Sequence, residues 1–156
     1  MSFRAMTHLH VDAATRIEHE GHPLDAWHAE AFRDAVAALR TYVCRVAVEP
    51  ASGVVGYAVV SLATDQGDLQ NLTVRADRRR QGLGRRLLDD ALGEVAGRGV
   101  REVFLEVRHD NAAAIGLYAS YGFNATGRRR NYYARGVDAV LMRLALGGHA
   151  SGGDLR

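Results

Sequence analysis

The chain has 156 residues, of which 47% are hydrophobic and 24% charged, and its formal net charge is +2. This length suits one domain that buries roughly two thirds of its unfolded surface, and the composition is that of a globular protein, not a disordered one. No apolar run approaches the roughly 18 residues of a membrane-spanning helix, and we find no signal-peptide core, so we expect a cytoplasmic protein without a membrane partner.

All 20 cationic side chains are arginines, and lysine is absent. The arginines concentrate at residues 78–86 and 128–130, which favours local phosphate recognition over the broad basic stripe of a nucleic-acid-binding protein. A nucleic-acid-binding module is therefore an alternative that rests on these clusters alone, and we expect no nucleic-acid partner. The single cysteine, Cys44, cannot form an intramolecular disulfide, which agrees with a reducing compartment.

The first 40 residues predict a strand followed by two helices. Residues 3–9 are a strand candidate, and Asp12 is positioned to cap a helix that continues to Glu20. Asp25 is positioned to cap a second helix over residues 26–39, whose apolar side chains recur with the helical period. Trp27 in this helix is expected in the core, with substrate contact as the alternative.

A group of acidic and histidine residues ends the first predicted helix. Glu18, His19, Glu20 and His22 are close in sequence and could suggest a metal site. Further histidines or cysteines at ligand spacing are missing, so we interpret all four as surface residues and predict no metal.

From residue 42 the hydrophobic period changes to two. Residues 42–49, 54–63 and 68–74 are predicted strands, and the first two form a hairpin. Cys44 lies in the first of these strands without a histidine nearby in the sequence to promote a thiolate. We expect it to be a small buried hydrophobic side chain, not a nucleophile.

A glycine- and arginine-rich turn follows the third of these strands and leads into a predicted helix over residues 85–95. Its sequence, Arg-Arg-Arg-Gln-Gly-Leu-Gly, occupies residues 78–84. Gly82 and Gly84 let the backbone turn tightly, and the N–H groups at the helix start point toward a bound anion. Arginine supplies forked donors suited to phosphate oxygens, so the turn predicts a pyrophosphate cradle.

Other interpretations of this turn are weaker. A dinucleotide fingerprint needs a third glycine where this chain has Leu87, and a nucleoside triphosphate loop needs a lysine. A solvated basic turn before an ordinary helix stays open on these residues alone.

The next predicted strand carries a carboxylate among apolar residues. Val103, Leu105 and Val107 face one side of it, which leaves Glu106 on the other. On alternation alone, Glu106 is either a functional group or a surface charge on an edge strand.

The rest of the chain predicts a helix and two strands. Asn111 can cap a helix over residues 112–121. Considered without its neighbours in the sequence, Tyr118 of this helix is typical of a core aromatic residue whose hydroxyl reaches solvent. Residues 124–133 and 138–146 form the last strand pair. We expect one domain over residues 1–146 and a disordered tail over residues 147–156.

Several motifs in order resemble the GNAT superfamily of N-acetyltransferases. Residues 80–84 resemble its [R/Q]-x-x-G-x-[G/A] acyl-coenzyme A loop. Residues 106–118, followed by Gly122-Phe123, are similar to a block of the ribosomal-protein alanine acetyltransferases of the RimI type, as are residues 129–133 and 138–142. The resemblance runs from about residue 69 to residue 144.

This resemblance implies an α/β fold in which a mixed, mostly antiparallel sheet of about seven strands is flanked by about four helices. It implies acetyl transfer from acetyl-CoA, as co-substrate, to the N-terminal α-amine of a protein, with a ribosomal protein as partner and a monomer or weak dimer as the active form. Alternatives are another peptide N-terminus, an amino acid or small amine as acceptor, or an acetyl-CoA-binding module without turnover.

The resemblance also assigns residues. Glu106 is the implied base and Tyr118 the implied acid, and direct transfer leaves Cys44 uninvolved. Tyr132 and Tyr133 are implied to line the peptide groove, where the chain departs from its relatives: it has Ala134 after the tyrosines where many have proline. The implied acetyl-CoA contacts are Leu72, Thr73, Val74, Arg80, Gln81, Gly82, Leu83, Gly84, Arg85 and Asn111.

Overall fold

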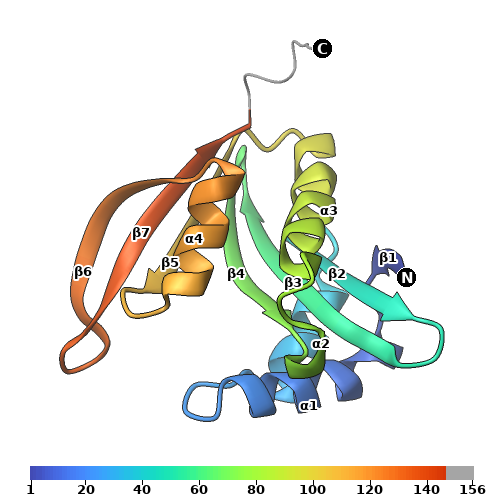
Figure 1. Cartoon of the computed structure of the whole chain (residues 1–156). Helices are drawn as coiled ribbons and strands as arrows, with labels where there is room; N and C mark the ends of the chain where they lie inside the picture. Colours follow the sequence, from blue (N-terminus) through green and yellow to red (C-terminus); the bar gives the residue numbers. More distant parts are fainter. Residues whose placement is uncertain (147–156) are drawn as a thin grey trace.

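A computed structural model describes residues 1–146, and the tail expected at residues 147–156 lies outside the described residues. One mixed sheet runs through the molecule in the order β1-β2-β3-β4-β5-β7-β6, with α-helices packed on its faces (Figure 1). Of the strand pairs in this described part, only β4 with β5 is parallel. The predicted fold class is confirmed.

The strands are Ser2–Ala5 (β1), Tyr42–Glu49 (β2), Gly53–Ala63 (β3), Gln66–Val74 (β4), Glu102–Arg108 (β5), Asn124–Ala134 (β6) and Val137–Ala145 (β7). The α-helices are Val11–Gly21 (α1), Ala29–Ala37 (α2), Leu83–Gly97 (α3) and Ala112–Tyr121 (α4). Two short 3₁₀ turns are His8–His10 (η1) and Ala76–Arg78 (η2).

The largest errors of the sequence prediction lie in the first 40 residues. The first strand ends at Ala5, because Thr7 begins η1 with a reciprocal cap to His10. Helix α2 begins three residues later than predicted, so Asp25 does not cap it. The Trp27 N–H instead bonds to the Glu18 carboxylate at 3.1 Å, which holds the segment between α1 and α2 as a loop.

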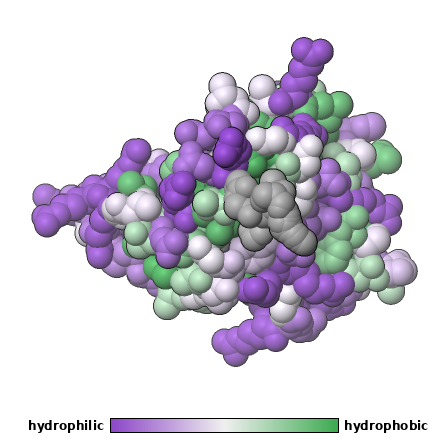
Figure 2. All heavy atoms as spheres, turned by 90° about the horizontal axis from the view of Figure 1, so that it is seen from above, coloured by the Kyte–Doolittle hydropathy of each residue, from purple (hydrophilic) through white to green (hydrophobic). Residues whose placement is uncertain are grey.

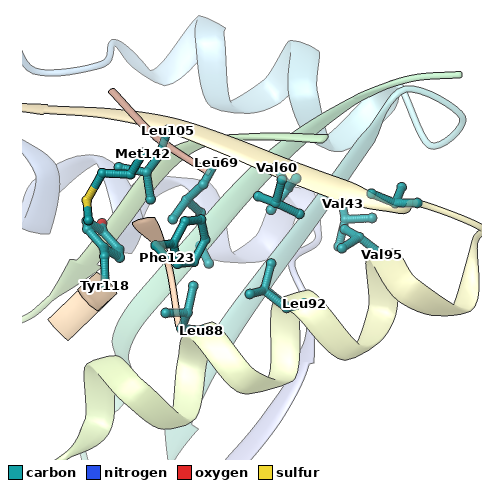
Figure 3. Packing of buried hydrophobic residues seen from close by; sticks show 14 of the residues in the cluster. Val43, Val60, Leu69, Leu88, Leu92, Val95, Leu105, Tyr118, Phe123 and Met142 are labelled. Atoms are coloured by element: carbon teal, nitrogen blue, oxygen red, sulfur yellow. The ribbon is translucent and has the colours of Figure 1, made fainter. Parts of the chain in front are cut away.

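The two largest hydrophobic clusters lie on opposite faces of the sheet. One joins α3 and α4 to the sheet, and Figure 3 shows Leu88, Leu92 and Val95 of α3 directed toward the side chains of the strands. The other joins α1 and α2 to β2 and β3, around Phe32 and Tyr57. As the helical period predicted, α3 buries Leu83, Leu87, Leu88, Ala91, Leu92 and Val95.

The sheet splits between its two parallel strands. Pairing of β4 with β5 is confined to residues 66–68 and 102–104, and beyond this point the strands diverge (Figure 1). A bulge interrupts the β3–β4 register at the same level, where Asn71 and Leu69 face consecutive β3 residues and Gln70 has no partner. Bulges of this kind re-aim side chains beside functional sites.

The surface is mainly polar around the β6–β7 hairpin, which forms the hydrophilic projection at the left of Figure 2. Exposed arginines at residues 128–130 and 135 account for part of this character. Within residues 1–146, the helices are too short or too polar to cross a membrane.

Candidate active site

A cavity of about 220 Å³ opens where β4 and β5 separate. Its walls come from five segments that are distant in sequence, because the split exposes the facing edges of both strands to the loop after α1, to α4 and to β6. The lining residues are Glu18, His22, Asp25 and Trp27; Leu69, Gln70, Asn71 and Leu72; Leu105, Glu106, Val107 and Arg108; Asn111, Ala114 and Tyr118; and Tyr133.

Glu106 enters this cavity from β5. Residue 106 lies beyond the short stretch over which β4 and β5 pair, so Glu106 lies on an open edge of β5 that borders the cavity. Its neighbours Leu105 and Val107 are buried as the alternation predicted, whereas 34% of the Glu106 side chain is exposed. Arg129 Nε lies 3.6 Å from Glu106 Oε2. The carboxylate is thus open to the cavity and able to exchange a proton there.

Tyr118 enters the same cavity from α4. Only 8% of the residue is exposed, and its ring packs edge-on against Phe123 with centroids 5.7 Å apart (Figure 3). Burial raises the pKa of Tyr118 to about 12, with a smaller contribution from Tyr133. The phenol therefore keeps its proton near neutral pH and can act as a donor.

The turn before α3 has the backbone of an anion cradle. Gly82 has φ +77° at the N-cap of α3, a conformation that side chains other than glycine rarely adopt. A Cβ on Gly84 would lie 3.3 Å from Leu117, so glycine lets α3 and α4 pack closely. The N–H groups of Leu83, Gly84 and Arg85 lie in the first helical turn, where no intrahelical carbonyl can accept from them.

The arginines of this turn differ in how far their charge is compensated by neighbouring groups. Arg78 is held by Glu49 at 2.9 Å and by the Ser52 hydroxyl, so its charge is largely compensated. Arg80 adopts φ +63°, a strained conformation for a non-glycine residue. Arg85 lies over the Tyr121 ring, with its Cζ 5.2 Å from the centroid.

The implied acetyl-CoA residues of β4 lie along the diverging part of the strand. Leu72 lines the cavity and pairs with Ala58 of β3, while Thr73 is buried and pairs with Tyr57. Val74 accepts a hydrogen bond from Arg79 Nε at 3.0 Å through its carbonyl. The turn from Arg80 to Arg85 does not line the cavity itself and is joined to this strand by η2.

Asn111 has two structural roles at once. Its Oδ1 accepts from the Ala114 N–H at 3.1 Å, which caps α4 as predicted, and the residue also lines the cavity.

The two tyrosines predicted for the acceptor groove differ in their position relative to the cavity. Tyr133 lines the cavity, whereas Tyr132 does not and is 47% exposed under Arg129.

Glu18 is the residue that sequence reasoning missed. Its interpretation as a surface residue is wrong, because only 2% of it is exposed. Its carboxylate accepts from the Tyr57 hydroxyl at 2.7 Å, the Asn71 amide at 2.9 Å and the Trp27 N–H at 3.1 Å. The signal was available, since Glu18 follows Val11 and Ala14 on the buried stripe of α1.

Trp27 and Cys44 also have clear positions. Trp27 packs against Phe32 with ring centroids 5.3 Å apart and lines the cavity, so it contacts both the core and the site.

Cys44 packs against the core around Phe32, and burial raises the pKa of its thiol to about 11. A thiol in this state is a poor nucleophile. Within residues 1–146, no three His, Cys, Asp or Glu side chains converge as metal ligands.

Comparison with known proteins identifies relatives of this architecture. Residues 3–123 match the model of the acetyltransferase (GNAT) family. An Escherichia coli K12 relative named ribosomal protein bS18-alanine N-acetyltransferase is 45% identical over 93 residues, which are 58% of this chain and 63% of that protein. The alignment thus spans less than two thirds of this relative.

Two other similarities extend over more of the chain. A Mycobacterium tuberculosis protein named N-alpha-acetyltransferase RimI is 40% identical over 124 residues, which are 76% of this chain and 75% of that protein. The crystal structure of the ribosomal-protein-S18-alanine N-acetyltransferase from Escherichia coli superposes with a TM-score of 0.83 and 34% identity, covering 92% of each chain.

Proposed function

The chain belongs to the acetyltransferase (GNAT) family, and on that premise we propose that it transfers the acetyl group of acetyl-CoA to the N-terminal α-amine of a protein. The proposed acceptor is the N-terminal alanine of ribosomal protein S18, the substrate in the name of the Escherichia coli relative and of the Escherichia coli crystal structure. The observation that carries the proposal is the convergence of Glu106 and Tyr118 on one cavity at the split of the sheet.

An acyl transfer to an amine needs a proton acceptor and a proton donor in the same space. A free α-amine has a reference pKa of about 7.7–8.0, so near neutral pH a fraction of the acceptor molecules is already unprotonated. A weak base therefore suffices to remove the proton that the amine loses during the transfer. We assign that base to Glu106, acting directly or through one water. The amine nitrogen bonds to the acetyl carbon, the carbon–sulfur bond breaks, and Tyr118 donates its proton to the departing thiolate.

The residues present fit acetyl-CoA as the acetyl donor. Among the described residues, the pairing of β4 with β5 ends at Asp68, so the backbone groups of residues 72–74 that point away from β3 lie on an open edge. The Val74 carbonyl already accepts from Arg79, and the remaining groups on this edge are available to an extended ligand. The N–H groups at the start of α3 and the Arg80 and Arg85 guanidiniums supply donors for a pyrophosphate. Gln81 to Gly84 form the turn that brings this backbone close to the ligand.

The acceptor enters, in this proposal, from the side of the cavity formed by the α1–α2 loop and β6. Trp27 and Tyr133 offer aromatic surface there, and Asp25 offers a carboxylate to a cationic amine. Tyr132 extends this surface outside the cavity.

Purified ribosomal protein S18 with an unmodified N-terminal alanine provides the test. Incubation with acetyl-CoA and this protein should place one acetyl group on the alanine nitrogen, located by tandem mass spectrometry. Acetylation confined to lysine side chains, or none with acetyl-CoA bound, would exclude the proposed activity.

A further inference from the structure

We propose that His22 is a second proton acceptor of the cavity, oriented by a hydrogen-bond chain that ends on the buried carboxylate of Glu18. The inference rests on the proposed function. His22 is the C-cap residue of α1 and lines the cavity opened by the split of β4 and β5. Its Nε2 lies 3.1 Å from Thr73 Oγ1, and Thr73 Oγ1 lies 2.8 Å from Asn71 Oδ1.

The direction of each hydrogen bond in this chain follows from the inventory of donors and acceptors. An ionised carboxylate only accepts, so Asn71 must present its amide nitrogen to Glu18, at 2.9 Å. The Asn71 carbonyl oxygen then faces Thr73 and accepts the hydroxyl proton. Because that proton is used, Thr73 Oγ1 can only accept from the ring of His22, and Nε2 must carry a hydrogen.

The consequence for His22 is a defined tautomer. With the hydrogen on Nε2, Nδ1 of the neutral ring holds the free lone pair. Glu18 makes this arrangement hard to reverse, because its two oxygens already accept from Tyr57 and Trp27 as well as from Asn71. Turning the chain around would set the Asn71 carbonyl oxygen against the carboxylate, acceptor against acceptor, where only 2% of Glu18 is exposed.

The chemistry of amine acetylation has a place for such a group. The acceptor nitrogen arrives as an ammonium and loses one proton before it attacks; it loses a second after it bonds to the acetyl carbon. One proton returns to the thiolate, and one is released to solvent. His22 Nδ1 takes the first proton: an N–H bond of the ammonium breaks and an Nδ1–H bond forms. Glu106 takes the second.

An imidazole is well matched to the first step. A neutral imidazole nitrogen is a stronger base than a carboxylate, so taking a proton from an ammonium is less unfavourable for it. Protonation at Nδ1 leaves the Nε2–H bond to Thr73 intact, so the chain survives the transfer. The charged and titratable groups around His22 are Glu18, Asp25 and Arg79 on its own side and Glu106, Arg108, Tyr118 and Tyr133 across the cavity.

Nitrogen NMR of protein labelled at histidine tests the tautomer without any substrate. At pH 8 the ring of His22, identified by its loss in His22→Gln, should carry hydrogen on Nε2 and a bare Nδ1. Hydrogen on Nδ1 would overturn the proposal. This result stands whether or not the protein acetylates the proposed acceptor, so failure of the proposed function is told apart from failure of this inference.

Kinetics of His22→Gln test the role in catalysis. Glutamine keeps a donor for Thr73 but is not a base, so kcat should fall about 10- to 100-fold while acetyl-CoA affinity is kept. His19→Gln, on the exposed side of the same helix, is the matched control and should behave as wild type. An unchanged kcat in His22→Gln would contradict the proposal.

Discussion

The Asn71 side chain donates to the Glu18 carboxylate at 2.9 Å, although the two residues are 53 positions apart. The bond ties the last turn of α1 to β4 at the bulge, where the sheet begins to split. The Trp27 N–H bonds to the same carboxylate, so one buried side chain fixes both the α1–α2 loop and the β4 wall of the cavity.

Removing the charge of Glu18 should therefore destabilise the fold. The Glu18 carboxylate now accepts hydrogen bonds from three donors. In Glu18→Gln the new NH₂ group must face at least one of these donors, which leaves that buried donor without an acceptor. We expect a loss of about 1–3 kcal/mol in the free energy of unfolding, measured by urea denaturation. Glu20→Gln, an exposed position on the same helix, should change it by less than about 0.5 kcal/mol. Equal effects of the two substitutions would contradict the structural role of Glu18.

Glu106→Gln and Tyr118→Phe should each lower kcat/KM by about 10²-fold or more, because they remove the proposed proton acceptor and donor with little change in shape. Steady-state kinetics with a peptide acceptor measures the effect. Glu102→Gln is the matched control, since this residue lies on the same strand outside the cavity and pairs with Arg143. Activity near wild type in both site variants would show the assignment to be wrong.

Much of the fold was accessible from the sequence because its signals are local. The period of two in β2 and β3, the apolar stripe of α3 and the caps of α4 depend on neighbouring residues, and these elements were predicted to within two or three residues. The errors lie where a distant residue decides the structure. The segment before α2 is a loop because the Trp27 N–H donates a hydrogen bond to the Glu18 carboxylate. This contact is not predictable from the local hydrophobic pattern around Trp27.

In the candidate site, too, the features with local sequence signals were predictable and those set by distant residues were not. Gly82 and Asn111 were predicted because a turn and a helix cap have short signatures. The separation of Tyr132 from Tyr133 depends on which face of β6 meets the cavity, and a bulge in the β6–β7 register makes that face hard to predict from alternation. The pairing of Arg78 with Glu49 joins η2 to the end of β2, 29 residues away, and no local pattern predicts it.

Gly82→Ala should weaken acetyl-CoA binding. The left-handed conformation at φ +77° costs an alanine about 1–2 kcal/mol, so the turn would shift away from the geometry proposed to hold the pyrophosphate. Apart from the chain neighbours of Gly82, no atom of the described residues lies within 4 Å of the added Cβ, so steric clash does not explain a loss. Isothermal titration calorimetry should give a higher Kd. Gly93→Ala, within α3 and also without close neighbours, should bind acetyl-CoA as wild type does.

The stability of the protein should fall at alkaline pH. Burial raises the pKa of Tyr118 to about 12 from an ordinary value near 10. The folded state therefore favours the neutral phenol, so its contribution is complete below about pH 10 and is lost as the pH rises toward 12. Urea midpoints at pH 8 and pH 11 measure the loss, which should be smaller in Tyr118→Phe. An identical loss in the variant would show that Tyr118 is not responsible.

The most direct test of the proposed activity compares two sets of short peptides incubated with the protein and acetyl-CoA and analysed by mass spectrometry. One set has a free N-terminal alanine and no lysine, and the other has a blocked N-terminus and an internal lysine. The account predicts acetylation of the first set only. Acetylation of the second set alone, or of neither while acetyl-CoA is bound, would contradict it.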